Sequence, residues 1–309
     1  MPPGTVRWTW MHHLINGRRR SKCGGTRAGG GMSKRRDVEG HINSLTEIHS
    51  IMESMKNLAM MEGQKLVRYQ NMQQQVLDAI TRALNDVRCH FAPEASWADA
   101  APIYLLLGSE RGFCGAYNEQ LLGVLEQQPG HGDAPVIGVG SRLVGPLEKS
   151  YPDAICLPGA AVADEVDKVL ASAISTLNHQ REKHGELRLE VIYFQPDTHE
   201  ARCQSALPSL EEKSGQGFAP LINLPSHQLL GELLEHYLFA VTHAWFFEAM
   251  LAENQRRMQH LDQAGRHIEH QLDDLRKRSN ALRQEEIIEE IEVILLTSEL
   301  ISSPGMKAI

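Results

Sequence analysis

The sequence predicts an α/β protein: a long antiparallel coiled coil of N- and C-terminal helices that carries a Rossmann-like α/β domain with a mostly parallel sheet of about five strands. Two observations support this prediction. Each end of the chain has apolar residues at helical spacing over many turns, and the segment between them alternates short apolar runs with helical stretches. We expect five parts, at residues 1–31, 32–92, 100–210, 211–225 and 226–309.

The C-terminal part shows the clearest pattern. Alternating steps of three and four residues run from Leu230 to Leu282 without meeting a charged residue or a proline. A mean spacing of 3.5 residues is the heptad signal for a helix that packs on another helix. A helix from Ser226 to Ser302 would be roughly 115 Å long at 1.5 Å per residue. It therefore requires a partner over most of its length.

The N-terminal part supplies that partner. From Asp37 to His90 the chain has no proline, and an apolar stripe is interrupted only at Glu62 and Gln73. Two helices with matching periods predict a hairpin-like antiparallel pair; the alternative is that each helix packs separately on a globular core. We expect these seam residues: Met52, Met55, Leu261, Ile268, Leu272 and Leu275. The remaining stripe on the first helix is expected at Val38, Ile42, Leu45, Ile48, Ala59, Leu66, Tyr69, Val76, Ile80, Ala83 and Val87.

The middle part has the pattern of a buried sheet flanked by helices. Short apolar or alternating runs predict strands at 103–107, 135–139, 154–157, 187–194 and 202–207. Helices are expected at 118–127 and 161–183. Because strands and helices alternate, the strands should be mostly parallel.

Composition excludes several classes of protein. The net charge of −8 argues against a nucleic-acid binder, and no apolar run reaches the ~18 residues of a membrane span, so we expect no direct membrane insertion. The five cysteines lie far apart and predict reduced thiols.

Residues 1–31 are basic and rich in glycine, and their composition differs from that of the rest of the chain. We interpret them as an artefact of start-site choice before Met32, with a disordered tail and a targeting segment as the alternatives.

No catalytic or metal centre is evident. The segment Gly108–Gly115 follows a strand where phosphate loops occur, but it lacks the Gly-Lys-Ser/Thr ending of a P-loop. A second Gly-x-Gly at Gly138 lacks the third glycine of a dinucleotide fingerprint, so both segments are interpreted as tight turns. His267 and His270 are spaced for a metal, but no third ligand is evident. We therefore expect no cofactor and no enzymatic activity of the chain alone.

Three segments resemble the gamma subunit, or central stalk, of F-type ATP synthases. The run from Ile42 to Ala59 is similar to the N-terminal helix of that family. The segment Ser109–Asn118 is similar to its S-D/E-R-G-L-C-G-x-x-N turn, through Arg111, Gly112, Cys114, Gly115 and Asn118. The run Arg283–Ile291 is similar to its C-terminal R-Q-x-x-I-T-x-E-L/I signature.

This resemblance implies a non-catalytic rotor shaft that couples ion flow through a membrane ring to ATP synthesis or hydrolysis. The implied partners are the alpha and beta subunits, the epsilon subunit and the membrane c-ring. The implied site is the cytoplasmic face of a bacterial inner membrane, where the chain would be a peripheral part of the F1 sector. Contacts with the alpha and beta subunits are expected at Arg283, Gln284, Ile287, Glu290, Ile291 and Ile294.

Three positions depart from the family pattern: Ile288, Val293 and Thr297. These departures suggest a divergent branch, such as the alternate or sodium-linked type. Two readings outside the family remain open: a nucleotide-binding α/β enzyme, and a coiled-coil adaptor with a receiver-like module.

Overall fold

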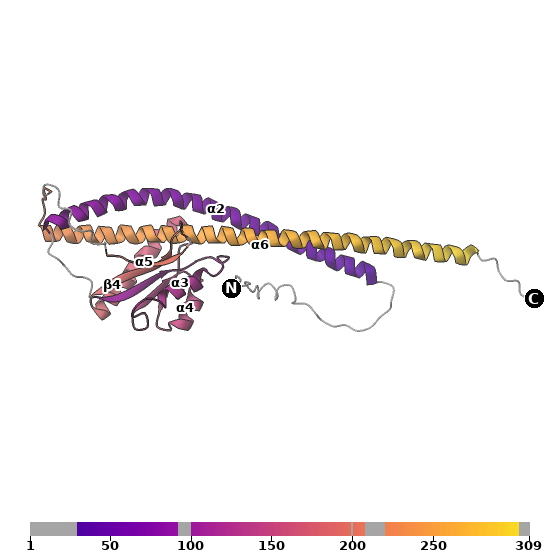
Figure 1. Ribbon diagram of the computed structural model, residues 1–309, viewed down its shortest axis with the longest axis horizontal. Coiled ribbons are helices and arrows are strands. Elements are labelled where there is room, and N and C mark those ends of the chain that lie inside the picture. The colour runs from indigo at the N-terminus through magenta and orange to yellow at the C-terminus, as the bar shows by residue number, and fades with distance from the viewer. Residues whose placement is uncertain (1–29, 92–99, 199, 208–219, 303–309) are drawn as a thin grey trace, which may run out of the picture. The chain divides into compact units, whose positions relative to one another are not determined.

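The computed structural model describes residues 30–91, 100–198, 200–207 and 220–302 (Figure 1). Most of the predicted extension 1–31 and of the predicted loop 211–225 therefore lies outside the described residues. The chain forms two compact units: the larger is Glu47–His270, and the smaller contains the described residues up to Thr46 and from Gln271 onward. The elements are α2 (Gly30–Phe91), β1 (Ala101–Leu107), α3 (Tyr117–Leu125), β2 (Val136–Val139), α4 (Val144–Ser150), β3 (Ile155–Leu157), the 3-10 turn η1 (Ala163–Glu165), α5 (Val166–His184), β4 (Leu187–Phe194), β5 (Ala201–Ser205) and α6 (Ser226–Ser302).

The larger unit contains the predicted sheet. Its five strands have the order β3-β2-β1-β4-β5, and all neighbours are parallel except β4 and β5, which are antiparallel. This confirms a mostly parallel sheet. The central strands β1 and β2 are short apolar runs because helices cover both faces of the sheet there, whereas the edge strand β5 contains polar residues and is partly exposed.

Alternate residues of β1 point into two separate cores. Leu105 packs with residues of α5 and α6 on one face, whereas Tyr104 and Leu106 pack with residues of α3 and α4 on the other. The sheet is thus the middle layer of three, with α6 in one outer layer (Figure 1). The period-2 geometry of a strand accounts for this division.

One helix was not expected from the sequence. Residues 144–150 form α4 although Pro146 lies inside it. Pro146 is at the third helical position, where the missing N–H has no intrahelical acceptor in any case, so the ring is tolerated. Leu147, fully buried against the sheet, holds this short helix in place.

The two long helices run antiparallel. In the larger unit, Lys56 Nζ lies 3.3 Å from Asp262, and His49 Nε2 lies 3.4 Å from Glu269. In the smaller unit, Arg35 Nη1 lies 3.0 Å from Glu286. Partner numbers on α6 rise as those on α2 fall, which confirms the predicted antiparallel pair.

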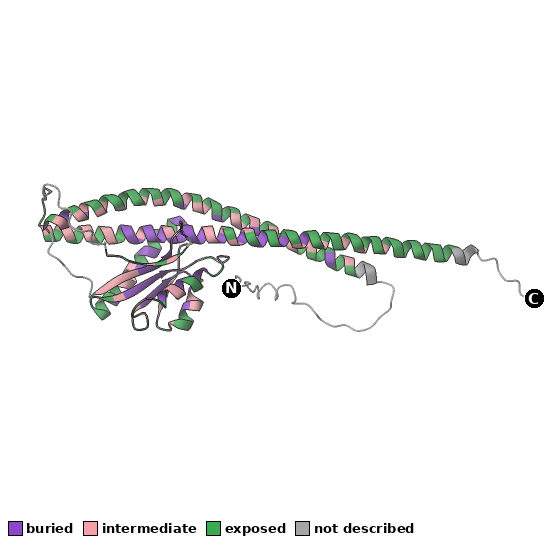
Figure 2. Ribbon diagram, viewed as in Figure 1, coloured by how far each residue is buried: buried purple, intermediate pink, exposed green. Residues whose placement is uncertain are grey.

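α6 is buried on every side in its middle. Phe247 stacks on Tyr69 of α2 with ring centroids 5.6 Å apart, whereas the Trp245 indole donates a hydrogen bond of 3.1 Å to Gln204 of β5. From Ala240 to Asn254 all side chains are buried except those of His243 and Glu248, which are half-buried (Figure 2). A helix that is apolar all round must be enclosed, and here α2 and the sheet enclose it.

The predicted stripe on α2 is wrong in part. Ile48, Tyr69 and Val76 are exposed, whereas Leu84, which lies off the predicted stripe, is almost fully buried. From Leu66 onward the shielded positions keep the 3.5-residue heptad, at 66, 70, 73, 77, 80, 84 and 87, so the predicted stripe lies one residue too early at Tyr69, Val76 and Ala83. Gln73 occupies one of them and donates a hydrogen bond of 3.2 Å to the Ala240 carbonyl, which satisfies a polar group in the interface.

Burial predicts which apolar residues of α6 stabilise the chain. Ile268 is 0% exposed and Ile294 is 65% exposed. We expect Ile268→Ala to lower the free energy of unfolding by about 2–5 kcal/mol, since it removes buried apolar surface and leaves a cavity. The matched control Ile294→Ala should change it by less than about 0.5 kcal/mol. Urea unfolding followed by circular dichroism measures both, and equal effects would contradict this packing.

Candidate functional site

The turn that follows β1 carries the family-like motif and is held together by short-range hydrogen bonds. The Ser109 amide donates to Asn118 Oδ1 at 3.0 Å, and Asn118 Nδ2 lies 3.0 Å from Ser109 Oγ. Phe113 and Gly115 both have positive φ, of 67° and 64°. These bonds bring the start of α3 back against the end of β1.

Glu110 joins this turn to two neighbouring loops. Its carboxylate accepts hydrogen bonds of 2.8 Å from the Ser141 amide, the Ser141 hydroxyl and the Gly159 amide. One carboxylate therefore links the loops that follow β1, β2 and β3, so the carboxyl edge of the sheet is closed by the chain's own side chain.

A second carboxylate, from α6, fills the anion-binding position of the turn. The amides of Glu110 and Arg111 donate to the two oxygens of Glu253 at 3.2 and 3.0 Å. Open α/β sheets bind ligands outside the carboxyl ends of their strands, at the point where the strand order reverses. Here that point lies between β1 and β4, and the amides available for a phosphate already have an acceptor. This geometry argues against the nucleotide-binding enzyme.

Arg257 completes the connection between α6 and the turn. It pairs with Glu253 one helical turn away, and its Nε donates to the Gly112 carbonyl at 3.1 Å. Nη1 donates to Asn254 Oδ1 at 2.7 Å. Burial raises the pKa of Glu253, whereas the Arg257 charge and the two backbone amides act in the opposite direction. The pair is almost fully enclosed, so its hydrogen bonds must all be satisfied.

The remaining motif residues have structural surroundings. A Cβ on Gly115 would lie 3.4 Å from His260 Cδ2, and its positive φ favours glycine. Gly112 is half-buried, and the Arg111 side chain is exposed. Cys114 is buried with its thiol 3.5 Å from the Arg111 carbonyl, and burial raises the pKa of Cys114 to about 12. This thiol is therefore a poor nucleophile and a poor metal ligand.

The predicted partner-contact residues lie in the smaller unit, on α6. Arg283, Gln284 and Glu290 are exposed. Seven apolar side chains between positions 287 and 296, here called the α6 tip, are 46–65% exposed: Ile287, Ile288, Ile291, Val293, Ile294, Leu295 and Leu296. All of them follow Glu286, the residue that pairs with Arg35 of α2. Figure 2 shows this end of α6 as exposed.

The predicted seam residues are all shielded. Met52, Leu261, Ile268 and Leu272 are buried, and Met55 and Leu275 are half-buried.

His267 and His270, considered as metal ligands, are both exposed. Within the described ranges, no group of three His, Cys, Asp or Glu residues could hold a metal ion. None of the described helices is long and apolar enough to cross a bilayer.

Sequence reasoning missed Glu253 and Arg257. The available signal was a charged i, i+4 pair directly after the uncharged run from Ala249 to Ala252. On a solvated helix such a pair is an ordinary surface ion pair. Here the surrounding apolar positions indicate that the pair is buried.

The Glu253–Arg257 pair allows a stability prediction. Glu253→Ala leaves a buried guanidinium and two backbone amides without an acceptor, so we expect a loss of about 3–5 kcal/mol in the free energy of unfolding. The control Glu269→Ala removes a carboxylate that is 62% exposed and should cost less than about 1 kcal/mol. Urea denaturation compares the two variants; a small loss for Glu253→Ala would show that the pair does not hold the turn.

The raised pKa of Cys114 predicts its reactivity. With a pKa of about 12, only about one thiol in ten thousand is ionised at pH 8, so alkylation by iodoacetamide should be very slow in the folded chain. The half-buried Cys89 should react faster. The rate at Cys114 should rise about tenfold per pH unit and become fast in urea. Mass spectrometry of digested peptides measures each site, and rapid labelling of Cys114 at pH 8 would refute its burial.

Sequence comparison finds relatives of similar length. An ATP synthase gamma chain from Clostridium botulinum (strain Kyoto / Type A2) is 24% identical over 271 residues, which cover 84% of this chain and 95% of that protein. A gamma chain from Staphylococcus carnosus is 22% identical over 289 residues, covering 85% of this chain and 98% of that protein.

Solved structures have the same fold. A chain in the mitochondrial ATP synthase of Euglena gracilis (OSCP/F1/c-ring, rotational state 3) superposes with a TM-score of 0.61 at 15% identity, covering 90% of this chain and 98% of the other. A chain in the rotor of the same enzyme gives a TM-score of 0.59, covering 82% and 99%. The family model described as ATP synthase matches residues 34–299. The chain therefore belongs to the ATP synthase family, as its three gamma-like segments predicted.

Proposed function

We propose that this chain is the gamma subunit, the central rotor shaft, of an F-type ATP synthase. It couples ion flow through a membrane ring to ATP synthesis or hydrolysis on the alpha and beta subunits and performs no chemistry itself. The observation that carries this proposal is the α6 tip. Its seven apolar side chains are exposed in this chain, so they need an apolar surface supplied by another protein.

The exposed residues of the α6 tip favour a contact in which the helix can rotate, rather than a fixed interface with one partner. Apolar side chains occur on several sides of the helix, because positions 293 to 296 are consecutive. A contact that surrounds a helix suits a sleeve formed by a ring of subunits, whereas a single partner helix would need only one stripe. In the proposed assembly the alpha and beta subunits form this sleeve.

The rest of the chain supports a stiff rotor. α2 and α6 pair in antiparallel fashion, and the α/β domain is joined to α6 through Glu253 and Arg257. Rotation of such a shaft presents different contacts to each catalytic subunit in turn and shifts the balance between its conformations. The torque corresponds to the difference in binding free energy between the shaft and the successive conformations of the catalytic subunits.

The α/β domain is assigned to the end of the shaft near the membrane. Its partners there would be the epsilon subunit and the c-ring, and the complex would lie on the cytoplasmic face of a bacterial inner membrane. The Euglena gracilis neighbour, a mitochondrial protein whose title names F1 and the c-ring, supports the c-ring as a partner by analogy of fold.

The first test uses the α6 tip. The triple change Ile287→Ser, Ile291→Ser and Ile294→Ser should leave the unfolding midpoint nearly unchanged, because these side chains are exposed. It should reduce assembly with the alpha and beta subunits at least tenfold, through lost apolar burial. The matched control places serine at three exposed apolar positions of α2, Leu58, Met61 and Met72, and should assemble normally. Unimpaired assembly of the tip variant would contradict the proposal.

The second test addresses polar contacts with the catalytic subunits. Arg283→Ala combined with Gln284→Ala should lower the ATPase rate of the assembled complex about tenfold, because charge-assisted contacts are lost. Arg278→Ala with Asn280→Ala is the matched control on the same helix and should have little effect. The purified wild-type chain should hydrolyse no ATP. Unchanged turnover in the first variant would reject the contact role.

A further inference from the structure

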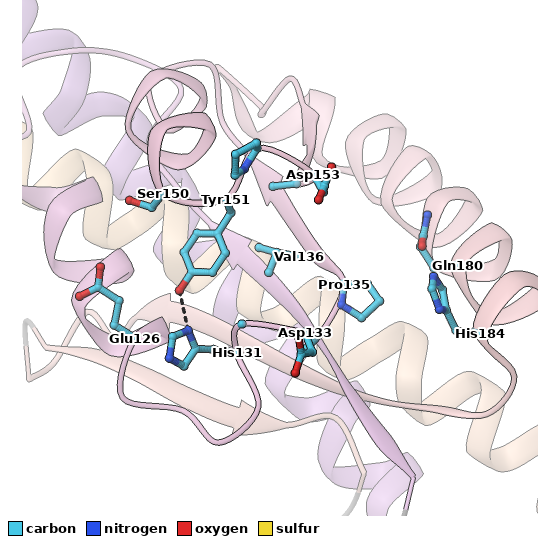
Figure 3. Close-up of a pocket in the computed structure, with 14 residues that line it drawn as sticks. Glu126, His131, Asp133, Pro135, Val136, Ser150, Tyr151, Asp153, Gln180 and His184 are labelled. Atoms are coloured by element: carbon cyan, nitrogen blue, oxygen red, sulfur yellow. Dashed lines mark hydrogen bonds between the residues drawn. The ribbon is translucent and has the colours of Figure 1, made fainter.

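Two surface features of the chain are not explained by the packing of its cores. The first is a pocket in the α/β domain, between the start of β2, the turn after α3 and the end of α5 (Figure 3). On one wall of this pocket the Tyr151 hydroxyl lies 2.8 Å from His131 Nδ1, so these two polar groups satisfy each other. The second feature is the exposed end of α6, whose surface is apolar. Exposed apolar surface indicates a partner protein, so the end of α6 says more about function.

The end of α6 differs chemically from the residues just before it. Glu292 is the last charged residue before Glu299, so the stretch 293–298, here called the end segment, carries no charge. All six of its side chains are exposed. The first four of them, at 293–296, are large and apolar.

The two polar side chains of the end segment bond to their own helix. Thr297 Oγ1 lies 2.5 Å from the Val293 carbonyl oxygen and 3.0 Å from that of Ile294. The Ser298 hydroxyl donates to the Leu295 carbonyl at 2.8 Å. Since each hydroxyl has only one proton, neither has a donor left for another protein. The side chains of the end segment therefore offer a partner apolar contact and no hydrogen-bond donor.

The departures from the gamma-family pattern fall on this exposed surface. Ile288, Val293 and Thr297 are all exposed. The signature R-Q-x-x-I-T-x-E-L/I has a threonine where this chain has Ile288, whose side chain is 56% exposed. A hydroxyl is thus replaced by hydrocarbon on a surface that the proposed assembly covers. Covered surfaces must match in polarity, because a buried polar group without a partner is costly.

The free chain gains nothing from these apolar side chains. Isoleucine and valine are branched at Cβ and are weaker helix formers than alanine or leucine. Ile288 and Val293 also expose apolar surface to water in the free chain. Any advantage they give must therefore arise in a complex, where a partner covers them.

We propose that these positions select the partner. The α6 tip accepts alpha and beta subunits whose ring is apolar beside Ile288 and residues 293–296, and it rejects subunits that present a charged or hydrogen-bonding side chain there. The rejection follows from burial, since such a side chain would be covered by hydrocarbon and lose its hydration. This inference rests on the proposed shaft function and adds the chemistry of the partner surface.

The first test compares two sets of alpha and beta subunits in reconstitution. One set comes from the organism of this chain, and the other from an F-type ATP synthase whose gamma chain has the signature threonine. Ile288→Thr should reduce the preference of this chain for its own set about fivefold or more, because the hydroxyl lacks a partner in an apolar ring. The control Ile51→Thr makes the same change at a position of α2 that is 60% exposed and should leave the preference unaltered. The measured quantity is the concentration of chain that gives half-maximal assembly, and an unaltered preference in Ile288→Thr would overturn the proposal.

The second test places a charge in the end segment. Val293→Glu should weaken assembly with the chain's own alpha and beta subunits about twentyfold or more, because the carboxylate would be buried without a partner. The control Val67→Glu introduces the same charge at an exposed position of α2 and should change assembly less than about twofold. Circular dichroism should show both variants folded, since both positions are exposed.

The outcomes separate partner selection from the shaft function. If Val293→Glu assembles as tightly as Val67→Glu, the proposed selection is wrong, although the shaft function stands. If the wild-type chain does not assemble with its own alpha and beta subunits, the shaft function is wrong and the selection falls with it.

Discussion

The structure depends on the burial of one stretch of α6 on all sides. Between Ala240 and Asn254 this helix packs on α2 through one face and on the sheet through the other, as Phe247 and Trp245 illustrate. Two hydrophobic interfaces therefore share one helix. A change that disturbs either interface is transmitted to the other because the helix between them is rigid and closely packed.

A buried polar network gives this apolar contact a defined orientation. Apolar packing alone tolerates sliding and rotation, whereas Glu253 and Arg257 each require particular partners in the turn after β1. The carboxylate from α6 occupies the place where many α/β proteins bind a phosphate. The same edge of the sheet thus serves as a joint between domain and helix instead of a ligand site.

The proposed function of this chain follows from the apolar surface that it leaves exposed. The seam of the helix pair is buried, and the α6 tip is not. Exposed apolar surface of this kind costs solubility in a free chain, and in the proposed assembly the alpha and beta subunits cover it.

The sequence by itself determined the fold class, the antiparallel helix pair and the strands, because apolar periodicity directly reports which side of an element is buried. It also identified the α6 tip, because the sequence alone shows an apolar run that continues beyond the end of the partner helix. Tertiary structure decided the rest. The second buried face of α6, the inward positions of α2 after Leu66 and the short helix around Pro146 depend on neighbours distant in sequence. In the sequence, Glu253 and Arg257 have the spacing of an ordinary surface ion pair. The pair is buried only because the turn after β1 lies close to α6 in the folded chain.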